Sequence, residues 1–238
     1  MPPNGSLVEH SALIARRFRR SIAASVVAFV ATVALAQDPS PLTPAQRTLV
    51  EDCRLLITGM NTPQARKYGA RQLLTTGWSA SIETLKTILV ENKDLAATVA
   101  VAQAIASVPD PSPDFIEPLI RLMASEDAVL RTEAATALAN YKNHGVAAQL
   151  GAVARDNAAN FTQRLAAIEA LGRISDTSAI DALIALLDDD NPEIRTRAIS
   201  ALHRVTGVNE GETAAAWKRW WQKNRAKTPL QWITELND

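Results

Sequence analysis

Residues that could carry out chemistry are few in this chain of 238 residues. The single cysteine, Cys53, cannot form an intrachain disulfide, and with only three histidines (His10, His144 and His203) no zinc-binding set is predicted. The run Asp188-Asp189-Asp190 lacks the alternating spacing and the glycine of a calcium loop, which indicates a turn. No G-x-S-x-G, H-E-x-x-H, P-loop or dinucleotide fingerprint occurs, and nothing pairs a nucleophile with a base. The sequence therefore predicts a protein that is not an enzyme and has no metal or cofactor.

A tryptophan cluster near the C-terminus is the other group of residues that could have a functional role. Trp217, Trp220 and Trp221 are spaced to lie on one face of a helix. The basic residues around them are Lys218, Arg219, Lys223, Arg225 and Lys227. One interpretation is a C-terminal cap whose indoles cover the last repeat of the fold. The other is an aromatic and basic surface for a partner, an anionic glycan or lipid headgroups.

Composition and charge indicate a folded helical chain without a preference for polyanions. Apolar residues make up 47% of the sequence, and there are only nine glycines. The formal net charge is zero, which argues against a nucleic-acid partner. Residues 1–36 contain four arginines and one glutamate, so the remainder carries 21 basic and 24 acidic side chains.

The N-terminal segment has the organisation of an export signal. The basic cluster of residues 16–20 precedes an uncharged apolar run of about 16 residues, which is shorter than a membrane-spanning helix requires. Ala34-Leu35-Ala36 then fits the small-x-small cleavage pattern. We expect residues 1–36 to be a signal peptide cleaved after Ala36 and residues 37–42 to be a short leader, so that the protein is periplasmic or secreted. The alternative is an uncleaved N-terminal anchor, which would place the chain at a membrane.

Five segments downstream align on one template, Arg-x-x-small-x-x-Ala-Leu. Their first residues, the anchors, are spaced 32, 33, 33 and 31 residues apart. The anchors are Arg66, Thr98, Arg131, Arg164 and Arg195. Four residues before each anchor stands a residue type that caps helix N-termini: Thr62, Asp94, Asp127, Asn160 and Asn191. Two independent features thus share one period, and each template is predicted to open a helix, called here the first helix of a pair.

A second helix is predicted between successive templates, because aliphatic residues recur there at spacings of three and four. The sets are Ile82-Leu85-Ile88-Leu89, Ile116-Leu119-Ile120-Met123, Val146-Leu150-Val153 and Ile180-Leu183-Leu186-Leu187. Residues 61–207 are therefore expected to form a repeat array. Residues 43–60, with Thr43 as N-cap, Pro44 at the first helical position and Gly59 beyond the end, predict an N-terminal capping helix. Residues 208–238 form the tryptophan-rich C-terminal segment.

From Thr62 to Gly207 the template resembles HEAT repeats, specifically the short kind of the phycobilin-lyase-like branch. The resemblance is strongest over residues 131–207 and weaker before them, where Thr98 replaces the anchor arginine. It implies an all-α fold, a right-handed α-α superhelix (α-solenoid) of about five helix pairs with capping helices at both ends. It further implies structural ion pairs between the anchors and turn residues of neighbouring repeats. The anchors concerned are Arg131, Arg164 and Arg195, and the candidate partners are Asp127, Asn160 and Asn191. Arg66 is the structural anchor of the weaker first unit.

Such an array is expected to bind a protein partner along a concave surface lined by the second helices. The polar contact candidates on those helices are Glu83, Lys86, Glu117, Arg121, Gln149 and Arg155. Their mixed charge favours a protein over a polyanion. Two alternatives stay open: membrane or glycan association through Trp217, Trp220 and Trp221, and the lyase-type activity that the family resemblance implies.

Overall fold

A computed structural model of the protein describes residues 41–141 and 145–227. The chain divides into two units, residues 1–41 and 42–238, and all of the described helices belong to the second. The described residues form eleven α-helices and two short 3-10 helices, with no strand among them. The predicted signal peptide, residues 37–40 of the leader, His144 and residues 228–238 of the C-terminal segment lie outside the described residues.

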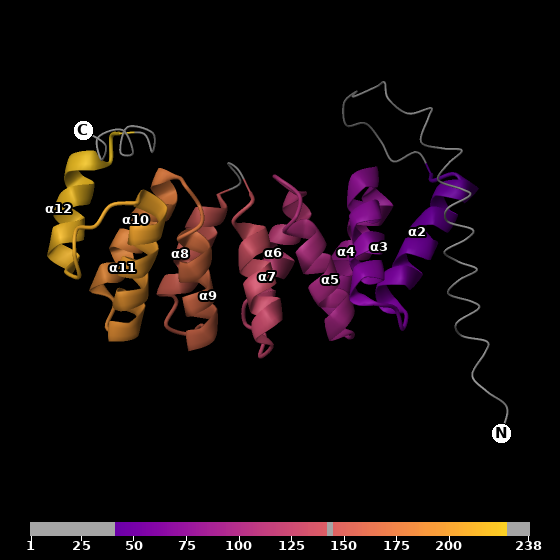
Figure 1. The fold of residues 1–238 in the computed structure, drawn as a ribbon, viewed down its shortest axis with the longest axis horizontal. Coiled ribbons are helices and arrows are strands. Elements are labelled where there is room, and N and C mark those ends of the chain that lie inside the picture. The colour runs from indigo at the N-terminus through magenta and orange to yellow at the C-terminus, as the bar shows by residue number, and fades with distance from the viewer. Residues whose placement is uncertain (1–40, 142–144, 228–238) are drawn as a thin grey trace. The chain divides into compact units, whose positions relative to one another are not determined.

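The first helices of the five predicted pairs lie side by side in one layer (Figure 1). They are α3 (Pro63–Thr76), α5 (Leu95–Ile105), α7 (Ala128–Leu138), α9 (Phe161–Leu171) and α11 (Pro192–Thr206). The second helices form the other layer, and they are α4 (Ser79–Glu91), α6 (Ile116–Leu122), α8 (Val146–Arg155), α10 (Thr177–Ala185) and α12 (Ala214–Asn224). Short 3-10 turns precede α6 (Pro113–Phe115) and follow α10 (Leu186–Asp188). The prediction of an all-α solenoid is confirmed.

All five predicted N-caps are present. The side chains of Thr62, Asp94, Asp127, Asn160 and Asn191 each accept a hydrogen bond from a backbone N–H in the first turn of their own helix. Pro63 and Pro192 occupy the first helical position, where the missing N–H would have no partner in any case. The repeat therefore begins at the same chemical signal in every unit.

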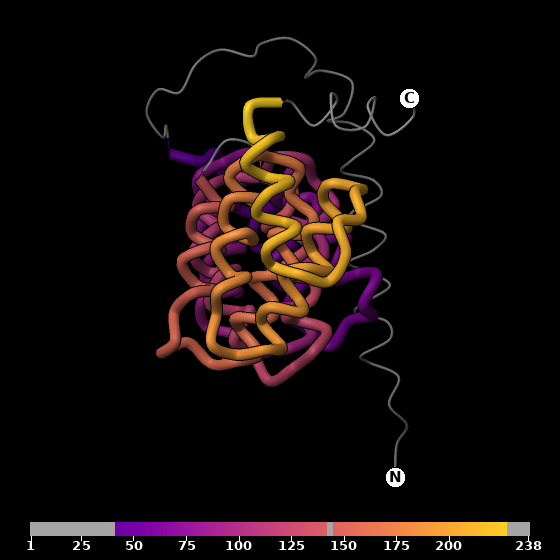
Figure 2. The backbone as a smooth tube through the Cα atoms, turned by 90° about the vertical axis from the view of Figure 1, so that its left-hand side faces the viewer, coloured from indigo at the N-terminus to yellow at the C-terminus, as the bar shows by residue number. Residues whose placement is uncertain are grey.

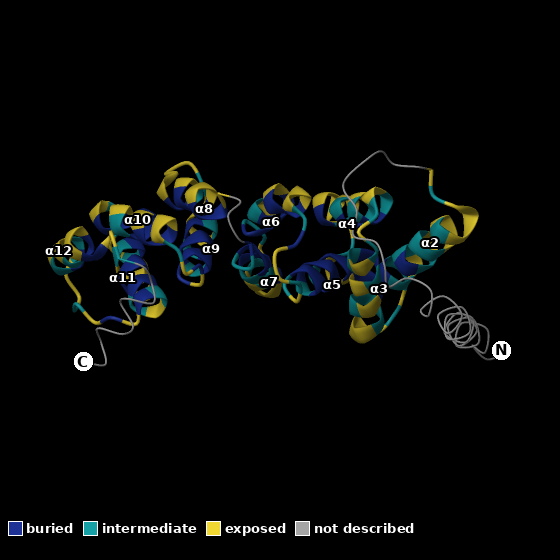
Figure 3. Ribbon diagram, turned by 90° about the horizontal axis from the view of Figure 1, so that it is seen from above, coloured by how far each residue is buried: buried dark blue, intermediate teal, exposed yellow. Residues whose placement is uncertain are grey.

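The core lies between the two layers, as the burial colouring in Figure 3 shows. In the last three repeats the small residue three positions after each anchor (Ala134, Ala167 and Ala198) is fully buried. The leucine four positions further along, as in Leu138 and Leu171, is also fully buried. Small residues let neighbouring helices approach closely, and the leucines fill the space between layers. This recurring pattern makes a single continuous core from units that could not fold alone.

The N-terminal capping helix is α2 (Pro44–Thr58), which packs on α3, α4 and α5. Thr43 and Gln46 form a reciprocal capping box at its start. Cys53 and Ile57 are fully buried. Gly69 in α3 faces them, and a Cβ atom at Gly69 would lie 2.9 Å from the carbonyl oxygen of Cys53. The close crossing of α2 and α3 explains why the small residue of the template is glycine in this unit.

The C-terminal element α12 contacts both α10 and α11, in the relation that earlier second helices have to their neighbours. It therefore acts as the second helix of the fifth pair as well as covering the end of the array. Figure 2 shows α12, in yellow, across that end. None of the described helices is long and apolar enough to cross a membrane.

Candidate partner-binding site

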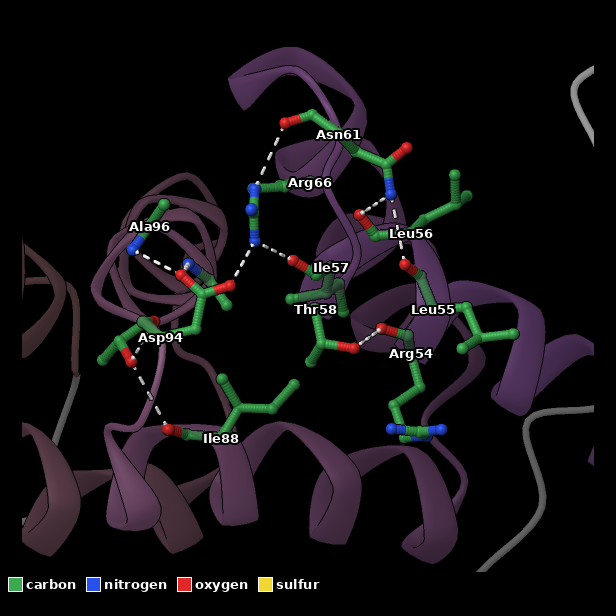
Figure 4. Close-up of polar contacts among 12 residues, drawn as sticks. Arg54, Leu55, Leu56, Ile57, Thr58, Asn61, Arg66, Ile88, Asp94 and Ala96 are labelled. Atoms are coloured by element: carbon green, nitrogen blue, oxygen red, sulfur yellow. Dashed lines mark hydrogen bonds and ion pairs between the residues drawn. The ribbon is translucent and has the colours of Figure 1, made fainter. Parts of the chain in front are cut away.

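The anchor arginines are structural, and Arg66 shows how they act (Figure 4). Its Nη1 atom donates to the carbonyl oxygen of Ile57 at 2.5 Å and to Oδ2 of Asp94 at 2.7 Å. Burial disfavours the charged form of Asp94, but the Arg66 guanidinium and the N–H groups of Ala97 and Ala96 outweigh it and lower the pKa of that carboxyl. One guanidinium thus joins the end of α2 to the start of α5.

Arg164 makes the same kind of link further along the chain. Its Nε donates to the carbonyl oxygen of Ala154 at 2.7 Å, and its Nη2 pairs with the carboxylate of Asp189. Only 8% of the Arg164 side chain and 10% of the Asp189 side chain are exposed. Through these bonds Arg164, on α9, holds the end of α8 and the turn before α11 together.

Arg131 and Arg195 instead donate to backbone carbonyls of the turn before their own helix. Arg131 binds the oxygens of Ser125 and Glu126, both at 2.8 Å, and Arg195 binds that of Asp189 at 2.6 Å. The predicted pairing of Arg131, Arg164 and Arg195 with Asp127, Asn160 and Asn191 is therefore wrong. For Asn160 and Asn191 the reason is that an amide has one acceptor oxygen, and that oxygen already caps the residue's own helix. Asp127 also caps its own helix through Oδ1, and Arg131 donates to the backbone of the turn instead of to the second oxygen of Asp127.

The tryptophan cluster is mostly internal. Trp217 is fully buried and donates through Nε1 to the carbonyl oxygen of Gly211 at 2.9 Å. Trp221 is 4% exposed, and its Nε1 donates to Asp181 of α10 at 2.6 Å. The prediction that these two residues contact a partner is wrong, because they cover α10 and α11 as the cap interpretation required. Trp220 stacks on Trp221 with ring centroids 6.0 Å apart and is partly exposed.

The contact candidates on the second helices lie at the surface, mostly in local pairs. Glu83 and Lys86 approach within 3.7 Å on α4, and Glu117 pairs with Arg121 on α6. Gln149 and Arg155 are exposed on α8. Although α4 contacts α6 and α8 contacts α10, α6 and α8 contact each other only slightly. The predicted row of contact residues is thus interrupted at its centre, and its role in binding stays a prediction.

A groove of about 370 Å³ crosses the other layer, over α7, α9 and α11. Its floor includes Ala166, which is 8% exposed and stands two residues after its anchor. The equivalent positions of the flanking repeats carry the long side chains Glu133 and Arg197. The short side chain of Ala166 therefore leaves a hollow between two helices with larger residues. Thr132, Thr162, Ser200 and Arg204 add polar groups around it.

The sequence-based prediction did not include this groove, because it placed the contact surface on the second helices. A signal was nevertheless present. The residues two, five and nine positions after the last anchor (Arg197, Ser200 and Arg204) are polar, face away from the core and line the groove. A comparison of the exposed residues at equivalent positions of successive repeats would have revealed the groove.

The two described side chains most suited to chemistry, Cys53 and His203, are buried or held by contacts within the fold. Burial, with the negative charge of Asp52 as a smaller cause, raises the pKa of the Cys53 thiol to about 12. Nδ1 of His203 lies 2.9 Å from the carbonyl oxygen of Val208, and its ring meets Trp217 edge-on. Over residues 41–141 and 145–227, no cluster of three or more His, Cys, Asp or Glu side chains could hold a metal ion.

The C-terminal part of the chain is similar to a known family of repeats. Residues 152–226 match the family of HEAT repeats. A solved engineered protein is 21% identical with a TM-score of 0.35, and the match covers 66% of this chain and 79% of that one. A computationally designed armadillo repeat protein for modular peptide recognition is 18% identical with a TM-score of 0.34, covering 74% and 87% respectively. No curated protein matches. The chain is an α-solenoid whose C-terminal repeats are similar to HEAT repeats.

Proposed function

We propose that this protein is an exported, non-catalytic module that binds a protein partner along its repeat array. The observation that carries the proposal is the groove over α7, α9 and α11, since it spans three consecutive repeats and is lined by side chains on helices. Stacked repeats offer extended surfaces of this kind to partners. A site built on packed helices needs little ordering when a partner binds, which favours affinity.

The non-catalytic part of the proposal is supported by how the polar side chains are used. The anchor guanidinium groups bind carbonyl oxygens and carboxylates of the framework. The one thiol is buried, and its raised pKa moves it still further from the thiolate form that a nucleophile needs. Membership of the phycobilin-lyase-like branch stays a prediction, and a spectroscopic titration with a bilin that shows binding would support it.

Export is proposed from the N-terminal sequence alone. We expect the protein recovered from the periplasm or medium to begin at Gln37 when its N-terminus is sequenced. A variant without residues 1–36 should remain in the cytoplasm. Recovery of the full-length chain in a membrane fraction would instead indicate an uncleaved anchor.

Site-specific photo-crosslinking in the native envelope tests the binding role. A photoreactive amino acid is placed at Ser200 in the groove, at Gln149 on α8 and, as a control, at Ala45 on α2. We expect one reproducible crosslinked partner from Ser200 and none from Ala45. A partner captured from Gln149 alone would support binding through the second helices. The absence of any reproducible product from both Ser200 and Gln149 would contradict the proposed function.

A further inference from the structure

The groove carries a local excess of positive charge on a chain that is otherwise mildly acidic. Its charged lining residues are Arg131, Arg197, Arg204 and Glu169. Glu169 pairs with Arg173 at 2.8 Å, and Arg197 pairs with Glu193 at 2.7 Å. Arg173 adds one positive charge and Glu193 one negative charge, so the net positive charge of the groove is unchanged. Beyond residue 36, by contrast, acidic side chains outnumber basic ones by 24 to 21. The groove is therefore an electropositive site that a negatively charged ligand would favour.

Two of its guanidinium groups are available to a ligand. Arg204 is exposed, and its side chain makes no hydrogen bond or ion pair with any described residue. Arg197 binds Glu193 only through Nε, and 60% of its side chain is exposed. An exposed ion pair of this kind adds little stability, so Arg197 can exchange its partner at small cost. Arginine presents a planar set of donors that matches a carboxylate with two parallel hydrogen bonds.

The spacing of these two residues suits an extended chain. Arg197 and Arg204 are two helical turns apart on one face of α11, about 10 Å along the helix axis at ~1.5 Å per residue. An extended peptide rises about 3.3 Å per residue, so acidic side chains two or three residues apart reach both. Leu165 and Ala166 line the groove on α9, and the short side chain of Ala166 leaves room for a small apolar side chain between the acidic ones.

We propose that the groove binds an extended, acidic segment of a protein partner, with carboxylates held by Arg197 and Arg204 and a small apolar residue over Ala166. This inference rests on the proposed binding function and names the chemistry of the segment recognised. A long polyanion fits less well, because Glu169 stands on the groove wall and acidic residues predominate in the rest of the mature chain.

Fluorescence anisotropy with synthetic peptides tests the inference on the full mature chain. The probes are a labelled peptide of alternating Glu and Ala, its counterpart of alternating Lys and Ala, and a labelled single-stranded oligonucleotide of equal charge. We expect the Glu-Ala peptide to bind most tightly and to weaken as salt rises. Arg204→Glu and Arg197→Glu should each lower its affinity about tenfold, as expected for loss of a charge-assisted hydrogen bond.

Arg71→Glu on α3 is the matched control, since it makes the same charge change on an exposed residue outside the groove and outside the contact candidates of the second helices. It should lower the affinity less than twofold. Ala166→Leu fills the groove without changing charge and should also weaken binding about tenfold, so it keeps the test valid if a charge reversal impairs folding. Circular dichroism melting curves establish that each variant is folded.

Three results would overturn the inference: equal losses in Arg71→Glu and Arg204→Glu, equal affinity for the Lys-Ala peptide, or tighter binding of the oligonucleotide. The last would mean that the groove recognises phosphate. A crosslinked partner at Ser200, together with any of these results, would leave the proposed binding function standing and remove only the acidic specificity.

Discussion

Arg164 of α9 and Asp189 of the turn before α11 form an ion pair in which both side chains are about nine-tenths buried. The two residues are 25 positions apart, so the contact joins consecutive repeats. Taking two charges out of water is costly, and the pair is held in place by further bonds, such as that from Arg164 to Ala154. The link therefore depends on both partners being present.

Breaking this pair should destabilise the fold strongly. Arg164→Met leaves the Asp189 carboxylate buried without its partner, and we expect a loss of about 3–5 kcal/mol in the free energy of unfolding. Urea denaturation followed by circular dichroism measures it. The exposed pair on α6 is the control, and Glu117→Gln should cost at most about 0.5 kcal/mol. Similar losses in the two variants would show that Arg164 and Asp189 are not buried together.

Gly69→Ala should destabilise the protein although alanine is the better helix former. The added Cβ would lie 2.9 Å from a backbone oxygen of Cys53 and 3.1 Å from Cβ of Leu56, so α2 would have to move. Overpacking of this kind costs about 1–3 kcal/mol, against a gain of ~1 kcal/mol from helix propensity. Thr87→Ala, on the exposed side of α4, isolates the propensity gain. A higher melting temperature for Gly69→Ala than for the wild type would contradict the close crossing of α2 and α3.

The ion pair of Arg66 and Asp94 should make stability depend on acid pH. Because the folded pKa of Asp94 is lowered, its contribution is present above its ordinary pKa of 3.8 and is lost as the pH falls below that value. Asp94→Asn should therefore reduce the free energy of unfolding at pH 7 and have a smaller effect near pH 3, below the ordinary pKa of 3.8. In an Arg66→Met background the effect at pH 7 should shrink. An effect of the same size at both pH values would argue against the ion pair.

The Cys53 thiol should be unreactive until the chain unfolds. Its pKa is raised from 9.0 to about 12, so almost no thiolate exists at pH 8, and the side chain is fully buried. We expect slow reaction with a disulfide reagent in buffer and fast reaction in guanidinium chloride. Thr87→Cys in a Cys53→Ser background supplies an exposed control thiol. Because thiolate forms first in the unfolded chain, stability should also fall as the pH rises from about 9 to about 12.

Replacing Trp217 should destabilise the protein much more than replacing Trp220. Trp217→Ala removes a fully buried indole and should cost about 3–5 kcal/mol, whereas Trp220→Ala, at a partly exposed position, should cost clearly less. Thermal melting measures both. Co-sedimentation with anionic liposomes provides a second readout, and we expect it to be unchanged by Trp220→Ala. Loss of liposome binding in that variant would restore the membrane alternative.

Local signals along the chain were sufficient to predict the repeat. A capping side chain such as Asp127, a small residue such as Ala134 and a leucine such as Leu138 act within one helix or between adjacent helices, so their spacing is visible in the sequence. The capping helix α2 was predictable for the same reason, from Thr43, Pro44 and Gly59.

By itself, then, the sequence determined the helix starts, the period and the buried stripe, because capping and amphipathic spacing are properties of short segments. Only the tertiary structure decided that Arg164 pairs with Asp189, since Asn191 is occupied by its own helix and only stacked repeats bring the earlier turn residue within reach. It also decided that Trp217 faces inward and that Ala166 lies in a groove beside Arg197. Such features depend on how neighbouring repeats stack, and no single segment encodes that.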